Sequence, residues 1–213
     1  MSNQKNDILM VGTGGHARFV ISVLNKISRP IKGLISVDEV YDPSEEILSN
    51  KIVGSILDLN YFYSMGYREL VLAIGDNQLR KDLFNKYSKA GFSFQSFIHP
   101  ESSVDTSLNL GEGNIFGPQV VIGANVQIGN NNIFNSSCVI EHETIVGNHC
   151  HVAPGATICG RVVLGNEVLV GANSTILDKK AVASKTIVGA GSTLIESVII
   201  ESQVMVGSPA RPI

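Results

Sequence analysis

The sequence lacks an excess of positive charge and any long apolar run. Its 16 lysines and arginines are outnumbered by 19 aspartates and glutamates, so the net charge is −3, which argues against a nucleic-acid-binding surface. No stretch of 18 uncharged apolar residues occurs, and the N-terminus lacks the basic and then apolar pattern of a signal peptide. We therefore expect a soluble cytoplasmic protein with no membrane span and no nucleic-acid partner.

Cysteine is scarce, and the spacings typical of metal sites are absent. The three cysteines, Cys138, Cys150 and Cys159, form no CxxC or CxxH pattern. We interpret them as small apolar fillers in a reducing compartment. His149 and His151 stand one residue apart, but no third ligand of suitable spacing accompanies them. The sequence therefore predicts no metal site.

The composition changes near residue 97. Up to that point the chain carries most of its charge, and beyond it the chain is apolar, rich in glycine and poor in lysine. A chain of 213 residues is long enough for two small domains. We expect an α/β domain over residues 1–97 and a different domain over residues 98–213.

A bulky apolar residue recurs at every sixth position from Ile98 to Val206, with no slip of register and no inserted loop. A small or β-branched residue mostly follows four positions after each bulky residue. Gly, Asn and Asp often occupy the positions between the two. A period of six is the pattern of a hexapeptide β-helix, in which three hexads close a triangular coil of about 18 residues and residues one coil apart stack. Gly, Asn and Asp tolerate the left-handed backbone that its corners need. The sequence thus predicts a left-handed parallel β-helix of about six coils.

The N-terminal segment carries the pattern of a nucleotide-phosphate site. A buried-strand run at 7–11 precedes a glycine turn of the form G-x-G-x-x-A at 12–17, and an amphipathic helix follows at 18–26. Glycine lets the backbone approach a ligand closely, and the N-terminus of a helix favours anionic oxygens. The His16 side chain can reach either a substrate phosphate or its own backbone.

Two further strands extend this pattern. One at 34–37 ends at Asp38-Glu39, where an acid can meet a ribose or a base, and one at 69–74 ends at Gly75-Asp76-Asn77 before a helix at 78–90. Together these elements indicate a half-Rossmann unit. Because the unit is too short for the two-half dinucleotide fold, a nucleotide sugar is favoured over NAD.

One corner of the predicted β-helix departs from the Gly, Asn and Asp pattern. Glu141-His142-Glu143 places a histidine between two carboxylates, projecting outward where packing does not require it. The carboxylates can orient the ring for proton transfer. A solvated polar corner is the alternative interpretation.

With these motifs, the chain resembles the bacterial family of sialic acid O-acetyltransferases and nucleotide-amino-sugar N-acetyltransferases. This family includes the enzyme that acetylates a UDP-4-amino-4,6-dideoxy sugar for bacillosamine. The resemblance rests on V-G-T-G-G-H at 11–16, A-I-G-D-N at 73–77 with Arg80 and Lys81, F-I-H-P at 97–100, N-S-S at 135–137 with I-E-H-E at 140–143, and V-G-S-P-A-R at 206–211. It implies a homotrimer with its active site between adjacent β-helices, acetyl-CoA along the groove and the sugar nucleotide on the N-terminal domain.

The resemblance also implies roles for individual residues. His142 matches the general base of the family, and Glu143 matches its hydrogen-bonded partner. Asn135 matches a polar residue at the reacting centre, and the N–H of Gly160 matches the oxyanion donor. His151 matches a residue near the acetyl group or the pantetheine thiol of the coenzyme.

Two larger sets of residues match the ligand-binding positions of the family. The nucleotide cradle comprises Gly12, Gly14, Gly15, His16, Asp38, Glu39, Gly75 and Asn77. The coenzyme groove comprises Gly171, Ala172, Val188, Gly189 and Ala190. Asp38-Glu39 departs from the two aspartates of several relatives, which leaves the contact to base or ribose open.

The expected reaction is direct acetyl transfer without an acyl-enzyme, with His142 accepting the proton of the attacking sugar amine or hydroxyl. N-acetylation of a nucleotide-linked 4-amino-4,6-dideoxy sugar and O-acetylation of sialic acid both fit, and no motif separates them, although the glycine turn favours the first. A non-catalytic, structural solenoid would require regular threonine ladders on a flat face, whereas this sequence interrupts its corners with Glu141-His142-Glu143. An oxidoreductase would require a second nucleotide-binding half, which the sequence lacks.

Overall fold

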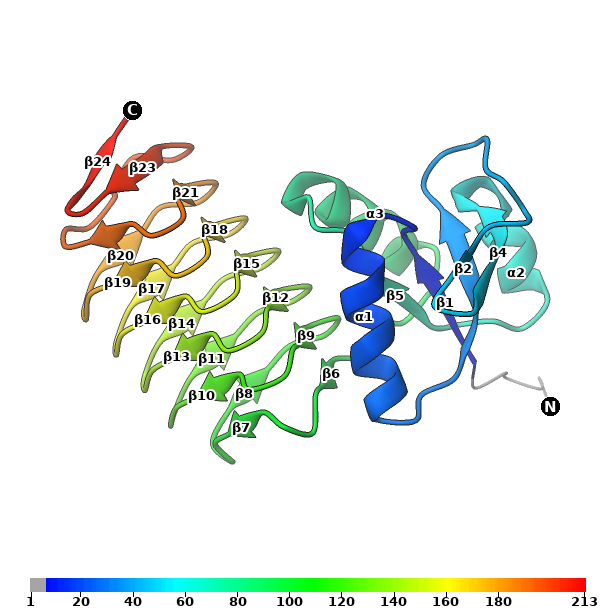
Figure 1. Cartoon of the computed structure of the whole chain (residues 1–213), viewed down its shortest axis with the longest axis horizontal. Coiled ribbons are helices and arrows are strands. Elements are labelled where there is room, and N and C mark those ends of the chain that lie inside the picture. Colours follow the sequence, from blue (N-terminus) through cyan, green and yellow to red (C-terminus); the bar gives the residue numbers. More distant parts are fainter. Residues whose placement is uncertain (1–6) are drawn as a thin grey trace. The chain divides into compact units, whose positions relative to one another are not determined.

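The computed structural model describes residues 7–213 and divides the chain into two compact units, one ending at Phe97 and one spanning Ile98–Ile213 (Figure 1). The first unit is an α/β sandwich and the second is a left-handed parallel β-helix. This confirms the predicted fold class.

The first unit is built on a five-stranded sheet in the order β3-β4-β2-β1-β5. Strands β1 (Ile8–Val11), β2 (Ile31–Ser36), β4 (Asn50–Ser55) and β5 (Leu70–Leu72) are parallel, and β3 (Glu46–Ile47) is antiparallel to β4. Every residue of β1 is buried, as expected for a strand covered on both faces. Because β2 and β5 flank β1, the strand order reverses at β1, and the carboxyl end of β1 is the usual ligand crevice of such sheets.

The helices of this unit are α1 (Gly15–Lys26), the short 3₁₀ helix η1 (Ile56–Asp58), α2 (Leu59–Ser64) and α3 (Asn77–Lys89). Helix α1 buries an apolar stripe that includes Val20 and Leu24, which is the spacing of one helix face. It begins earlier than the sequence pattern predicts, directly on the glycine turn. No pattern in the sequence predicted β3, β4, η1 or α2.

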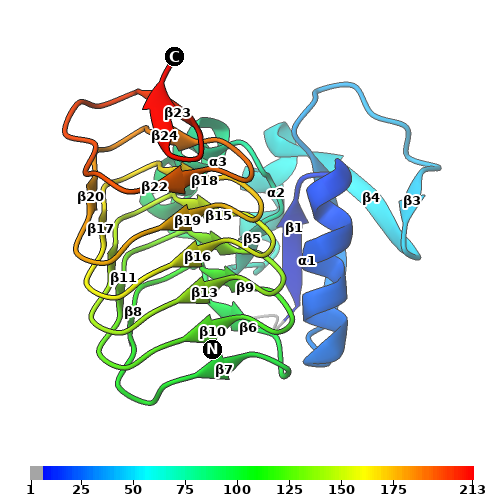
Figure 2. The same cartoon turned by 60° about the vertical axis from the view of Figure 1, so that its left-hand side comes forward.

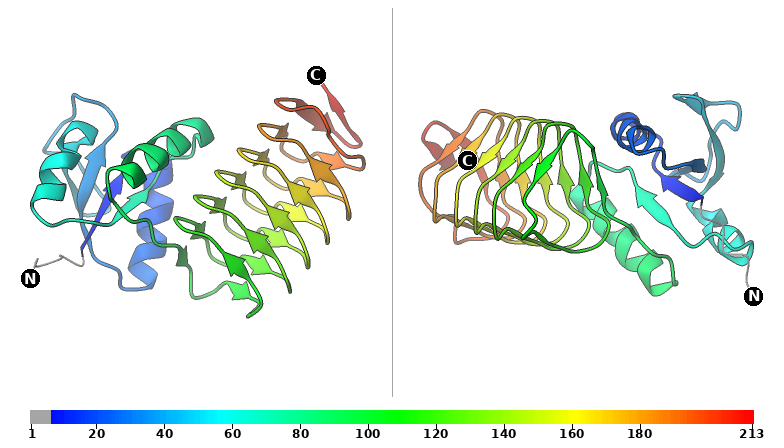
Figure 3. Two further views of the ribbon diagram at one scale, coloured as in Figure 1. Left: turned by 180° about the vertical axis from the view of Figure 1, so that it is seen from behind. Right: turned by 90° about the horizontal axis from the view of Figure 1, so that it is seen from below.

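In the second unit most hexads form one two-residue strand, and three faces arise (Figures 2 and 3). Face one comprises β7 (Ser103–Val104), β10 (Val121–Ile122), β13 (Val139–Ile140), β16 (Thr157–Ile158), β19 (Thr175–Ile176) and β22 (Thr193–Leu194). Face two comprises β8 (Asn109–Leu110), β11 (Gln127–Ile128), β14 (Ile145–Val146), β17 (Val163–Leu164) and β20 (Ala181–Val182). Face three comprises β6 (Phe97–Ile98), β9 (Ile115–Phe116), β12 (Ile133–Phe134), β15 (His151–Val152), β18 (Leu169–Val170), β21 (Ile187–Val188), β23 (Val204–Gly207) and β24 (Ala210–Pro212).

The interior of the β-helix follows the predicted register over most of its length. Each strand pairs with its counterpart on the next coil, as in Val139 with Thr157. The sixth-position residues from Phe116 to Leu194 are almost fully buried, and Phe116 stacks on Phe134 with ring centroids 4.7 Å apart. Cys138 and Cys150 also face this interior, as predicted. Cys159 does not, because it lies partly exposed at a corner, so its interpretation as a core filler was wrong.

The corners contain more charged residues in the left-handed conformation than the Gly, Asn and Asp pattern suggests. Glu143, Arg161 and Lys179 all have φ between 58° and 59°. Such a backbone costs about 1–2 kcal/mol in a residue with a Cβ. Hydrogen bonds to the preceding coil compensate for this cost, as in the N–H of Glu143 donating to the carbonyl of Ala124 at 2.8 Å.

The predicted register fails after Leu194. Ile200 is 62% exposed, whereas Val198 and Met205 take the interior positions. Met205, and not Val206, pairs with Val188, so the last coil is shorter than the others. The prediction that Ile200 and Val206 fill the core was therefore wrong. The last coil has no further coil above it, and it shortens instead of repeating the spacing of the other coils.

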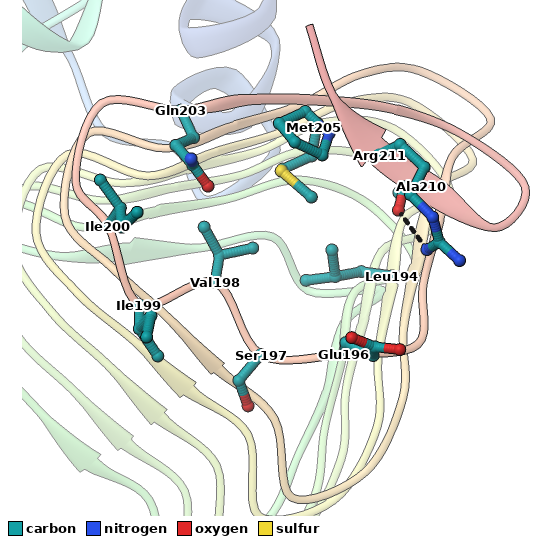
Figure 4. Close-up of a pocket in the computed structure, with 11 residues that line it drawn as sticks. Leu194, Glu196, Ser197, Val198, Ile199, Ile200, Gln203, Met205, Ala210 and Arg211 are labelled. Carbon is teal, nitrogen blue, oxygen red and sulfur yellow. Dashed lines mark hydrogen bonds between the residues drawn. The ribbon is translucent and has the colours of Figure 1, made fainter.

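The last coil surrounds a depression of about 340 Å³ (Figure 4). Interior-type side chains line it, including Leu194, Val198 and Met205, together with Glu196 and Arg211. None of the predicted site residues lines it. The depression is the open end of the solenoid, and β24 folds back beside it in the antiparallel direction.

Candidate functional site

His142 and Glu143 lie together at the corner between faces one and two, just after β13. The His142 Nδ1 atom is 3.1 Å from the Glu143 Oε2 atom, and about half of each side chain is exposed. A carboxylate at Nδ1 holds the tautomer with the proton on Nδ1. Nε2 is then the nitrogen that can accept a proton. The sequence-based pairing of these two residues matches the geometry.

Gly160 lies directly beside the His142 ring, one coil further along. The two coils are joined here by a hydrogen bond, because the N–H of Arg161 donates to the carbonyl of His142 at 2.9 Å. A Cβ on Gly160 would stand 2.7 Å from both the Cε1 and Nε2 atoms of His142. The N–H of Gly160 has no hydrogen-bond partner within residues 7–213. It can therefore donate to a ligand atom that binds beside Gly160.

The predicted coenzyme residues lie at another corner. Gly171 and Gly189 occupy equivalent positions on successive coils at the corner between faces three and one. Asn135, which was predicted at the reacting centre, lies at the same corner, and its Oδ1 atom accepts a hydrogen bond from the N–H of Ser136 at 2.8 Å. Ala172 and Ala190 follow two of these residues along the chain. Within one chain the structure thus separates this set from His142 by the width of face one.

Two members of the coenzyme prediction differ from the rest. His151 lies in β15 on face three and not at a corner. Val188 has no exposed surface and fills the interior of the β-helix. Its carbonyl accepts a hydrogen bond from Gly171. The side chain of Val188 therefore faces the core, and only its backbone can contribute to the predicted coenzyme groove.

The eight predicted nucleotide residues follow the carboxyl ends of β1, β2 and β5, three neighbouring strands. Gly12 is required by the fold, since its φ is +118° and a Cβ there would stand 2.6 Å from the carbonyl oxygen of Ala73. A Cβ on Gly14 or Gly15 would meet nothing within 4 Å. A Cβ on Gly75 would have the Cβ of His16, at 4.0 Å, as its nearest neighbour. The fold gives no reason for glycine at these three positions, and the space beside them is open.

The N-terminus of α1 borders this space. Gly14 is the capping residue of α1 and supplies no side-chain cap. The first N–H groups of a helix carry partial positive charge and bind anions. Asp38 and Glu39 lie at the end of β2, where Glu39 is exposed, and the Asp38 N–H donates to the Ser36 Oγ atom.

Sequence reasoning missed the position of Arg80. Its side chain is 1% exposed and lies beneath the turn that follows β5. Its Nη1 atom donates to the carbonyl of Ile74 at 3.0 Å, and its Nη2 atom donates to the Asn77 Oδ1 atom at 2.8 Å. The turn and helix pattern predicted the acids at the strand ends but gave no signal that this charged residue is buried. Arg80 fixes the orientation of Asn77.

Within residues 7–213, no group of three or more His, Cys, Asp and Glu side chains is arranged to hold a metal ion. No helix in that part of the chain is both long and apolar enough to cross a membrane.

Family models match both units. A model described as the PglD N-terminal domain matches residues 7–87, and a model described as the GMPPB C-terminal domain matches residues 93–189. Comparison with curated protein sequences found no match.

Solved structures match the whole chain. PerB from Caulobacter crescentus, determined in complex with CoA and GDP-perosamine, is 32% identical, with a TM-score of 0.91, 97% of this chain covered and 96% of that chain. A second structure from the same organism is described as GDP-perosamine N-acetyltransferase and is 30% identical, with a TM-score of 0.91 and the same coverage. The acetyltransferase domain of PglB from Neisseria gonorrhoeae shares the fold at 22% identity, with a TM-score of 0.90, 98% of this chain covered and 100% of that chain.

Three observations agree. A histidine pairs with a carboxylate at a β-helix corner, the glycine turn of the first unit is open, and a 32% identical relative aligns over both units. The chain belongs to the hexapeptide-repeat family of sugar N-acetyltransferases.

Proposed function

We propose that the protein transfers the acetyl group of acetyl-CoA to the amino group of a nucleotide-linked 4-amino-4,6-dideoxy sugar used in bacterial surface-glycan synthesis. The observation that carries this proposal is the His142–Glu143 pair, whose imidazole ring lies beside Gly160 with its Nε2 atom on the Gly160 side. A base and an oxyanion donor side by side are what acyl transfer to an amine requires. The binding of CoA and GDP-perosamine by PerB supports the assignment of both substrates.

In the proposed reaction the sugar amine attacks the thioester carbonyl. A nitrogen–carbon bond forms while His142 accepts the amine proton at Nε2, and the N–H of Gly160 donates to the developing oxyanion. The carbon–sulfur bond then breaks, and the imidazolium returns a proton to the thiolate of CoA, so that the enzyme is restored. One such oxyanion donor is typically worth about 3 kcal/mol. Glu143 stabilises the imidazolium that forms between the two proton transfers.

The nucleotide is proposed to bind at the carboxyl ends of β1, β2 and β5. The open space beside Gly14, Gly15 and Gly75 leaves room for a diphosphate against the backbone and the N-terminus of α1. Asp38 and Glu39 provide acceptors for ribose or base hydroxyl and amino groups. Asn77, oriented by Arg80, adds a further polar contact.

The coenzyme is proposed to lie along Gly171, Ala172, Gly189 and Ala190, with Asn135 and His151 near the acetyl group. Because this corner and His142 are separated by face one in a single chain, we propose a homotrimer in which a neighbouring chain completes each site. Both substrates are cytoplasmic metabolites, so we place the enzyme in the cytoplasm.

The test is to incubate the protein with acetyl-CoA and a panel of GDP-, UDP- and dTDP-linked 4-amino-4,6-dideoxy sugars, together with free and CMP-linked sialic acids. Mass spectrometry should show one added acetyl group on an amino-sugar nucleotide. Acetylation of the sialic acids alone would replace the proposal with O-acetylation. Light scattering in the same buffer should give three times the 22.8 kDa mass of the chain, and a monomer would contradict the shared site.

A further inference from the structure

Gly160 is a glycine for a reason that lies outside its own backbone. Its φ is not in the left-handed region, so its conformation is open to other residues. It stands in a column of stacked corner positions that also contains Ala124, His142 and Asp178, each on a successive coil. Alanine and aspartate thus occupy the same corner without difficulty. The coil geometry does not demand glycine at this position.

The atoms around the missing Cβ show what does demand it. The three nearest atoms all belong to the His142 imidazole, with Cε1 and Nε2 at 2.7 Å and Cδ2 at 3.2 Å. At Gly129 and Gly147, in contrast, a Cβ would meet the carbonyl of the glycine on the next coil at 2.8 Å or less. Those glycines serve coil packing. Gly160 serves one side chain.

We propose that Gly160 is a positioning residue, whose bare Cα is the surface against which the His142 ring rests while Glu143 holds its Nδ1 edge. This inference rests on the proposed function for its catalytic meaning. It assigns Gly160 a steric role that is separate from oxyanion donation by its N–H. The two contacts restrain the ring in different directions, since Glu143 fixes the Nδ1 edge and Gly160 limits motion toward the next coil.

Gly160→Ala separates the two roles. The variant keeps the N–H and adds only a methyl group, which forces the ring to move by several tenths of an ångström. Because the ring is half exposed, it can swing outward at little cost in stability. We expect an unchanged melting temperature and a kcat lowered about 10²-fold, since a misplacement of this size disrupts a near-attack geometry, with little change in the KM for acetyl-CoA.

The matched control is Ala124→Gly, which changes one methyl group at the equivalent corner on the other side of His142. It should leave kcat unchanged. The decisive measurement is a double-mutant cycle with GDP-perosamine and acetyl-CoA. If Gly160 acts through His142, Gly160→Ala should have almost no effect in a His142→Ala background. A further loss there of about 10-fold or more would overturn the proposal and assign the effect to the oxyanion or the coenzyme.

A second readout needs no substrate. The chain has five histidines, so protein labelled with ¹³C at histidine Cε1 should give five ring signals, and His142→Ala identifies the one that belongs to His142. Gly160→Ala should shift that signal alone, and Ala124→Gly should not. An unshifted His142 signal would overturn the proposal. If the wild-type protein acetylates no sugar nucleotide, the proposed function fails, and the ring signal still decides whether Gly160 positions His142.

Discussion

The two units of the chain satisfy their backbones in different ways. In the β-helix nearly every coil donates to the next one, so the N–H of Ile133 finds the carbonyl of Cys150 on the following coil. In the α/β unit, β1 pairs with strands from two separate parts of the chain, as in Leu9 with Gly33 and with Leu70. The first arrangement repeats and the second does not. As a result, proposed chemistry lies at an exceptional corner in one unit and at the common edge of several strands in the other.

The largest effect is expected at the corner that contains His142. His142→Ala should lower kcat about 10²- to 10⁴-fold, the usual contribution of a general base, while light scattering and acetyl-CoA affinity by calorimetry stay unchanged. Glu143→Ala should cost less, because that carboxylate only orients the ring and stabilises its charge. With an amine acceptor the loss in His142→Ala should shrink as pH rises, because more amine becomes unprotonated. Wild-type turnover in His142→Ala at pH 7 would remove the corner from the mechanism.

In the α/β unit, breaking a buried ion pair should lower the free energy of unfolding more than breaking an exposed one. Arg29 contacts Glu69, whose side chain is 10% exposed, and burial raises the pKa of Glu69 while Arg29 opposes that rise. Arg29→Met should lower the free energy of unfolding by about 2 kcal/mol at pH 7, somewhat less than for a fully buried pair. Lys51→Met, which breaks the exposed pair with Glu46 in the same unit, should cost less than about 0.5 kcal/mol.

The pH dependence of this defect has a definite sign. A carboxyl whose pKa is raised in the folded protein favours the protonated state, so its stabilising contribution is present below its ordinary pKa of 4.5 and is lost as pH rises through the folded value. Without Arg29 that pKa rises further. The difference between Arg29→Met and the wild type in urea unfolding should therefore narrow as the pH falls from 7 toward 4.5. A difference independent of pH would show that the pair contributes packing and not charge.

Substitutions at two glycines of the same turn should affect different properties, nucleotide binding in one case and stability in the other. Gly14→Val places a side chain in open space, so the melting temperature should hold while the KM for the sugar nucleotide rises about 10-fold, because the backbone no longer reaches the phosphates. Gly12→Ala strains a φ of +118° and collides with Ala73, so it should lower the melting temperature instead. Equal loss of nucleotide and acetyl-CoA binding in Gly14→Val would argue against a local cradle.

The smallest expected effect concerns the cysteines of the β-helix. Burial raises the pKa of Cys138 to about 12, so this thiol should react with a disulfide reagent only after unfolding. Burial, with Asp178 and Glu141 nearby, also raises the pKa of the partly exposed Cys159. Native protein should thus label at Cys159 alone, slowly at pH 7 and faster as pH rises. Asp178→Asn should accelerate the reaction, and rapid labelling of Cys138 would show that the coils open.

The periodic unit was predictable from sequence because its long-range pairing is written as a fixed spacing. The hexad register correctly directed Phe116, Val152 and Leu194 to the interior. It failed at Ile200, where no next coil exists to impose the spacing. The α/β unit was predictable only where strands end in glycine turns or acids. Strands β3 and β4 carry no such ending, and their place in the sheet depends on distant partners.

The candidate site divides in the same way. The pairing of His142 with Glu143 is local in sequence and was predicted. His142 and Gly160 are 18 residues apart, which is one coil of the β-helix. The hexad period therefore predicts that they stack. The burial of Arg80 depends on the packing of α3 against the sheet, for which the sequence holds no comparable spacing.

The antiparallel strand β24 affects how one end of the β-helix can associate with other molecules. A parallel β-helix that ended on a regular coil would offer open strand edges, which can recruit the first coil of another molecule and grow into a fibre. On face three, β24 pairs with β23 in the opposite direction, so the edge strand there does not continue the parallel pairing of the coils. The shortened last coil also breaks the spacing that the other faces would need. We therefore expect the C-terminal end of the β-helix to oppose end-to-end stacking of a second molecule.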